Sequence, residues 1–106
     1  MDFSKIKLNA ISLYYELRKN QIHPDIIILF GSHSKGDSTP SSDVDLAVVS
    51  RDFGKNRIKE GAKINKILYK IFPEAEAIPI SLNEYLNSEN VSPILNEIKK
   101  TGIVLL

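Results

Sequence analysis

Residues 26–50 read IIILFGSHSKGDSTPSSDVDLAVVS, a polar loop between two apolar runs. The first run, Ile26 to Phe30, holds five large apolar residues rich in β-branching, which predicts a strand buried on both faces. Residues 31–42 are turn-forming nearly throughout, and Asp43 to Ser50 is typical of a second strand. A loop that follows a central strand is where folds of this kind bind their ligands.

The sequence on either side alternates between helical and strand patterns. We expect a first helix from the caps Asp2 and Ser4 to Asn20, and a second helix from Lys55 to Ile71. Glu76 to Ser81 predicts a third strand, which Pro79 restricts to an edge, a strand end or a bulge. The apolar stripe predicted for the second helix comprises Ile58, Ala62, Ile64, Ile67, Leu68 and Ile71.

The last quarter of the chain predicts three short elements. Leu82 to Asn87 is expected to form a short helix, and Ser92-Pro93 is typical of an N-cap followed by proline in the first turn. That helix should run to about Lys100, with Gly102 as a left-handed C-cap, before a short strand over residues 103–105. The predicted class is therefore α/β or α+β, a small mixed sheet with helices packed on it.

Composition narrows the classes of function. The 106 residues predict one domain over positions 1–106, and a net charge of +1 gives no reason to expect direct nucleic-acid binding. Without cysteine, disulfides, thiolate zinc sites and cysteine nucleophiles are excluded. No apolar run has the length of a signal peptide or a membrane helix, so we expect a cytoplasmic protein without a membrane partner.

The start of the polar loop favours phosphate binding. Gly31 lets backbone approach a phosphate closely, and Ser32 offers a hydroxyl and an N–H group. If a helical turn begins near Ser32, its unpaired N–H groups favour an anion. Lys35 and Gly36 fit this interpretation, whereas His33 is more typical of an exposed loop residue.

The end of the loop favours metal binding. Asp43 and Asp45 stand two apart at the start of a strand, so both carboxylates face one side while Val44 and Leu46 face the other. A divalent cation relieves their mutual repulsion, and Mg²⁺ takes such carboxylates together with phosphate oxygens. An Asp-X-Asp alone is most often a pair of solvated strand ends, but its combination with the buried strand and Gly-Ser indicates phosphoryl or nucleotidyl transfer.

The stretch LFGSHSKGDSTPSSDVDLAVV, residues 29–49, resembles the signature of the DNA polymerase β-like nucleotidyltransferase superfamily: Gly-Ser, ten residues, Asp-X-Asp. The size of the chain resembles the minimal nucleotidyltransferases, or MNT proteins, which include the antitoxins of HEPN/MNT toxin–antitoxin pairs. This resemblance implies the polymerase β-like fold. It also implies that the helical HEPN toxin is a protein partner.

The resemblance also implies a role for each site residue. Gly31 and Ser32 would hold the triphosphate of ATP, with Lys35 as a point charge for phosphate and Gly36 beside it. Asp43 and Asp45 would bind two Mg²⁺ ions. The third carboxylate of the family, usually an aspartate on the following strand, corresponds to Glu76 in this sequence. Glu74, two residues earlier, is the alternative.

Three functions follow as hypotheses. The first is a Mg²⁺-dependent transfer of AMP from ATP to a hydroxyl of a protein partner, by which an antitoxin would modify and neutralise a HEPN ribonuclease toxin. The second is a non-catalytic antitoxin or binding module that masks its partner sterically and keeps a vestigial nucleotide site. The third, a nucleotidyltransferase acting on a small molecule, is least favoured because it needs an acceptor-binding half.

Overall fold

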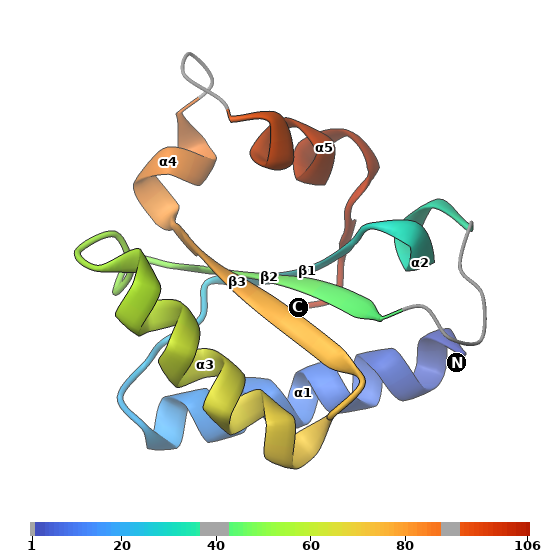
Figure 1. Cartoon of the computed structure of the whole chain (residues 1–106), viewed down its shortest axis with the longest axis horizontal. Coiled ribbons are helices and arrows are strands. Elements are labelled where there is room, and N and C mark those ends of the chain that lie inside the picture. The colour runs from blue at the N-terminus through green and yellow to red at the C-terminus, as the bar shows by residue number, and fades with distance from the viewer. Residues whose placement is uncertain (1, 37–42, 88–91) are drawn as a thin grey trace.

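A computed structural model describes residues 2–36, 43–87 and 92–106 (Figure 1). Within these ranges, no helix is long and apolar enough to cross a membrane. Four strands form one sheet with the order β3-β2-β1-β4, accompanied by α-helices of four to seventeen residues. In chain order the elements are α1 (Phe3–Lys19), β1 (Ile26–Phe30), α2 (Ser32–Lys35), β2 (Val44–Ser50), α3 (Arg57–Ile71), β3 (Ala75–Ser81), α4 (Leu82–Leu86), α5 (Pro93–Thr101) and β4 (Ile103–Val104).

The sheet is mixed, as the sequence predicts. β1 lies at its centre and pairs antiparallel with both β2 and β4, while β2 pairs parallel with β3. The parallel connection runs through α3, because parallel neighbours need a crossover that is usually a helix. The antiparallel β1–β2 pair brings the last residue of β1, Phe30, opposite Asp45 near the start of β2.

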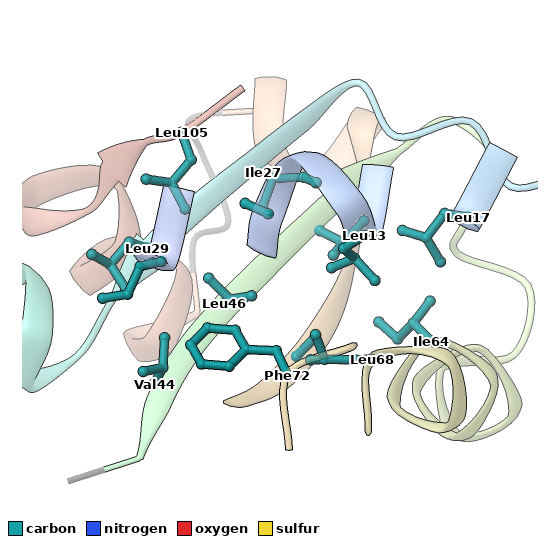
Figure 2. Close-up of a cluster of buried hydrophobic side chains, with 14 of the residues drawn as sticks. Leu13, Leu17, Ile27, Leu29, Val44, Leu46, Ile64, Leu68, Phe72 and Leu105 are labelled. Carbon is teal, nitrogen blue, oxygen red and sulfur yellow. The ribbon is translucent and has the colours of Figure 1, made fainter. Parts of the chain in front are cut away.

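Each face of the sheet carries its own apolar core. One core joins α1 and α3 to the sheet, and Figure 2 shows Leu13, Leu68 and Phe72 packed among the side chains that β1 and β2 direct to this face. The other core lies beneath α4 and α5. Ile27 and Ile28, neighbours in β1, belong to different cores, which confirms that this strand is buried on both faces.

β3 forms one edge of the sheet, which confirms one of the positions that Pro79 allows. On its outer side, the carboxamide of Asn65 accepts a hydrogen bond from the N–H of Ala77 at 2.8 Å and donates one to the carbonyl of Ala77 at 2.7 Å. Backbone groups two residues apart point to the same side of a strand, so Pro79 also faces outward. Its missing N–H therefore removes no hydrogen bond to β2.

Two details differ from the sequence predictions. Ile58 was expected in the apolar stripe of α3, but its side chain is 86% exposed because it lies on the side of the helix that borders the open edge of β3 rather than on the side packed in the core. Ala62 is exposed as well. Gly102 follows α5 with φ −68°, which is not left-handed. Glycine is needed there for a different reason, since a Cβ would collide with the Ile98 carbonyl and with Ile28.

Candidate active site

Gly31 joins β1 to α2, and two independent constraints require glycine at this position. Its φ is +76°, a left-handed value that other residues adopt only with strain. A Cβ at Gly31 would also collide with the carboxylate of Asp45. The carbonyl of Gly31 accepts hydrogen bonds from the N–H of Ser34 at 3.2 Å and the hydroxyl of Ser34 at 2.8 Å. The turn that begins at Gly31 thus lies close against the start of β2.

The helical turn expected near Ser32 is present as α2, whose first residue is Ser32. Gly36 ends this turn with φ +77°, in the left-handed conformation of a helix C-cap. Ser32 and His33 are half-buried, so His33 is not the exposed loop residue expected from the sequence. The structure therefore brings Gly31, Ser32 and Gly36 into one compact turn at the end of β1.

Asp45 and Glu76 lie side by side on adjacent strands. They are directly paired in the parallel β2–β3 register, which places both side chains on the same face of the sheet. Val44 and Leu46 belong to the core beneath α1 and α3, so Asp45 points to the opposite face, as the alternation predicts. Asp43 stands just before β2 and is exposed. Asp37, a further acid of the loop, lies outside the described residues.

The electrostatics of this end of the sheet are unfavourable to a carboxylate. Partial burial raises the pKa of Asp45, and the negative charges of Glu76 and Asp43 raise it further. Protonated His33 would act in the opposite direction. Like charges held together in a partly buried place disfavour the ionised form, and a bound cation removes this penalty. The arrangement therefore suits a positively charged ligand.

A fourth acid approaches the site from α5. Glu97 forms an ion pair with Lys35, and its negative charge also contributes to the raised pKa of Asp45. No sequence pattern points to Glu97, because it stands more than fifty positions from Asp45 and its helix carries no motif. In this structure the ammonium group of Lys35 is thus directed toward α5. A phosphate that binds Lys35 would compete with the Glu97 carboxylate.

The donor chemistry fits Mg²⁺ bound together with a nucleotide. Among the described residues, no three His, Cys, Asp or Glu side chains lie close enough to form a metal site by themselves. Mg²⁺ is commonly held by one or two carboxylates and completed by substrate phosphates, which is what Asp45 and Glu76 can offer. Glu74 precedes β3 and binds the Val44 N–H through its carbonyl at 3.0 Å. By register, Glu76 is therefore the better partner of Asp45.

The chain is similar to known proteins in sequence and in structure. A protein of Methanocaldococcus jannaschii named "Putative protein adenylyltransferase MJ1305" is 30% identical over 95 residues, covering 88% of this chain and 56% of that protein. This chain therefore spans little more than half the length of that relative. A chain from a crystal structure of a toxin–antitoxin with AMP-PNP gives a TM-score of 0.57 at 26% identity, over 94% of this chain and 72% of that one.

A second solved structure shows a similar fold. It is a tri-AMPylated Shewanella oneidensis HEPN toxin in complex with an MNT antitoxin, matched with a TM-score of 0.52 at 24% identity over 93% of this chain and 70% of the other. A sequence profile of the family described as "Polymerase beta, Nucleotidyltransferase" matches residues 13–106. The matched range includes Gly31, Asp45 and Glu76 and covers most of the chain. The chain therefore belongs to the polymerase beta nucleotidyltransferase family.

Proposed function

We propose that this chain transfers AMP from ATP, with Mg²⁺, to a hydroxyl of a protein partner, and that the partner is a helical toxin of the HEPN class. The observation that carries the proposal is the contact of the Gly31 turn with Asp45, beside Glu76 in register. The relatives add support, since one is named an adenylyltransferase and others are solved with AMP-PNP or with an AMPylated HEPN toxin. A cytoplasmic location stays a prediction.

Each residue has a defined part in this proposal. The backbone of Gly31 and Ser32, with Lys35 and the turn closed by Gly36, would hold the triphosphate. Mg²⁺ ions, two by the family resemblance, would be held by Asp43, Asp45 and Glu76. Bound there, they supply charge stabilisation of the phosphates.

The reaction would be a displacement at the α-phosphorus of ATP. The acceptor oxygen forms a bond to that phosphorus, and the bond to the bridging oxygen of pyrophosphate breaks. The acceptor proton passes to a carboxylate oxygen of Glu76, the nearest acid on the exposed edge strand. This chain would thereby position both reactants and accept one proton.

Transfer of label from ATP to a partner tests the proposal. The chain is incubated with Mg²⁺, ATP labelled at the α-phosphate and a HEPN protein encoded beside it. We expect the Asp43→Asn, Asp45→Asn double variant to reduce the rate of label transfer to the partner by a factor of roughly 10² or more. ATP labelled at the γ-phosphate should label nothing. If the wild-type chain binds the partner but transfers no label, the enzymatic proposal fails.

Steric masking is the second candidate function, and one observation favours it. Lys35 is paired with Glu97, so a phosphate that binds Lys35 must first displace the Glu97 carboxylate. Protection of cells from the toxin separates the two functions. The Asp43→Asn, Asp45→Asn variant should protect fully if masking suffices, and should lose protection if transfer is required. Circular dichroism of the variant checks that it is folded.

A further inference from the structure

A groove follows the exposed edge strand β3 away from the candidate active site. It consists of two adjoining hollows, of about 450 Å³ and about 350 Å³, which share Gly61 and Ala62 in their walls. The first hollow is lined by Asp43 and Glu76, and the second reaches Ile58. In Figure 1, β3 crosses the front of the molecule with α3 on one side and α4 and α5 on the other.

One stripe of α3 faces this groove. Ile58, Gly61, Ala62, Asn65 and Tyr69 recur at helical spacing and line one or both hollows. The two bulky members, at the ends of the stripe, are the most exposed, Ile58 at 86% and Tyr69 at 71%. The small residues Gly61 and Ala62 thus form the middle of the groove, with a large apolar side chain at each end.

Gly61 is not explained by the fold of this chain. It lies inside α3, where glycine destabilises a helix relative to alanine. Its φ is not in the left-handed region, and a Cβ would meet Pro79 at 3.6 Å, an ordinary contact. Neither conformation nor packing within the chain requires glycine at this position. The absent side chain instead keeps the passage between the two hollows open.

The two ends of the groove differ in chemistry. Asp43, Glu74 and Glu76 line the first hollow, and no basic side chain of the described residues does. The second hollow is mostly apolar, and the ion pair of Arg57 with Glu84, at 2.8 Å, stands in its wall. A ligand that spans both hollows therefore needs positive charge near the carboxylates and apolar surface at the other end.

The outer edge of β3 offers little to a partner strand. The backbone of Ala77 is already bonded to the Asn65 carboxamide, and Pro79 has no N–H. Recognition in the groove thus depends on the side chains of the ligand rather than on strand pairing. From Glu76 to Ile80 the strand advances about 13 Å, which an extended peptide covers in roughly four residues.

We propose that this groove binds an extended segment of the acceptor protein. The acceptor hydroxyl lies at the carboxylate end, next to a basic residue, and a bulky apolar residue about four positions away occupies the hollow beside Ile58. The inference rests on the proposed nucleotidyl transfer. It adds to that proposal the residues of this chain that select the acceptor segment.

Fluorescein-labelled nonapeptides with a single tyrosine provide the test, measured by anisotropy without nucleotide. In each parent peptide, an arginine stands next to the tyrosine and a leucine stands four residues from the tyrosine. In one series of peptides the leucine precedes the tyrosine, and in the other it follows the tyrosine. We expect one parent peptide to bind wild type at least roughly tenfold more tightly than its leucine-to-alanine or arginine-to-glutamate version. Equal binding of all three peptides in both series would overturn the proposal.

Two variants and one control locate the binding. Ile58→Asp should remove the preference for leucine, and Leu8→Asp, at a residue of α1 that is 65% exposed, should leave it unchanged. Gly61→Ala should raise thermal stability and yet weaken peptide binding several-fold, a combination that a merely structural role of Gly61 cannot give. An Ile58→Asp variant with unchanged preference would contradict the assignment.

The outcome separates this inference from the proposed function. Calorimetry with MgATP on the same preparations reports nucleotide binding independently of the peptides. Selective peptide binding without MgATP binding would support the groove and count against nucleotidyl transfer. MgATP binding without selective peptide binding would leave the active site in place and refute the groove.

Discussion

The two ends of the β1–β2 ladder both carry acidic residues, but the protein treats them in opposite ways. At the start of β1, Asp25 accepts hydrogen bonds from the Arg51 guanidinium at 2.8 Å and the Arg51 N–H at 2.9 Å. The side-chain hydrogen bond is the main cause that lowers the pKa of Asp25. At the other end, burial and the neighbouring acids raise the pKa of Asp45.

A second acid at the Asp25 end of the ladder, Asp52, is also paired within the chain. The N–H of His23 donates to Asp52 at 2.8 Å, and this bond is the main cause that lowers the pKa of Asp52. Every carboxylate there thus has its partner within the chain. At the Asp45 end, the neighbouring acids and partial burial outweigh the opposing effect of His33, and the pKa of Asp45 is raised. The contrast supports the proposal that the Asp45 end binds the ligand, whereas the acids at the Asp25 end stabilise the fold.

A matched pair of glycine substitutions should give the largest difference. Gly31→Ala meets both the left-handed φ and the Asp45 carboxylate, and we expect it to destabilise the fold by about 3 kcal/mol and to abolish MgATP binding. Gly36 has a similar φ, +77°, but its ψ of 11° lies in the left-handed helical region, which strains an L-residue less than the ψ of −154° at Gly31 does, and nothing lies within 4 Å of a Cβ there. Gly36→Ala should therefore cost only about 1 kcal/mol.

Urea unfolding and calorimetry with MgATP measure both effects. Equal destabilisation by the two substitutions would show that neither the backbone conformation of Gly31 nor its close approach to Asp45 costs more than an ordinary left-handed residue. The tight packing of the Gly31 turn against Asp45 would then have no energetic role.

Removing the Ser50 hydroxyl, at the Asp25 end of the ladder, should have an intermediate effect on folding stability. It should have no effect on nucleotide affinity. Ser50 is fully buried, donates to the His23 carbonyl at 2.8 Å and accepts from the Asp52 N–H at 3.0 Å. Ser50→Ala leaves both groups without this partner and should cost about 2 kcal/mol in urea unfolding. MgATP affinity should stay at the wild-type value. A change in affinity would show that the two ends are coupled.

The smallest expected effect is that of Asp25→Asn on folding stability, measured as a function of pH. The pKa of Asp25 is lowered below its ordinary value of 3.8, so its ionised form stabilises the folded state above that pH. This stabilisation is lost as the pH falls through the lower pKa of the folded state. Asp25→Asn should therefore reduce stability at pH 7, by less than Ser50→Ala does, and should approach wild type near pH 2. A constant difference between the two proteins across this range would refute the assignment.

Much of the fold and the site could be predicted from local sequence. The five apolar residues of β1 and the alternation at Val44 and Asp45 are properties of neighbouring positions, and the structure confirms the strands they predict. The strand that carries Glu76 is present as well, and the register places that residue beside Asp45. Whether these residues bind metal and nucleotide stays a prediction.

The rest depends on distant packing, which local patterns do not contain. Glu97 reaches Lys35 only because α5 packs against the sheet. Ile58 has the spacing of a core residue but lies on the side of α3 that borders the open edge of β3. Gly102 was expected to supply a left-handed φ, and instead it lets Ile98 and Ile28 approach closely. The ion pair of Glu97, the exposure of Ile58 and the contact of Gly102 with Ile28 all involve elements that lie far away in the sequence.

The central claim is that Asp45 is held at a cost to the fold in order to bind a metal–nucleotide. Thermal unfolding of wild type and Asp45→Asn, each with and without MgATP, tests it directly. Because the pKa of Asp45 is raised, its ionised form disfavours folding at pH 7, and this penalty fades as the pH falls below that pKa. We predict that Asp45→Asn unfolds at a higher temperature than wild type without ligand, while only wild type gains stability from MgATP. A less stable variant, or one that gains as much from MgATP as wild type does, would contradict the account.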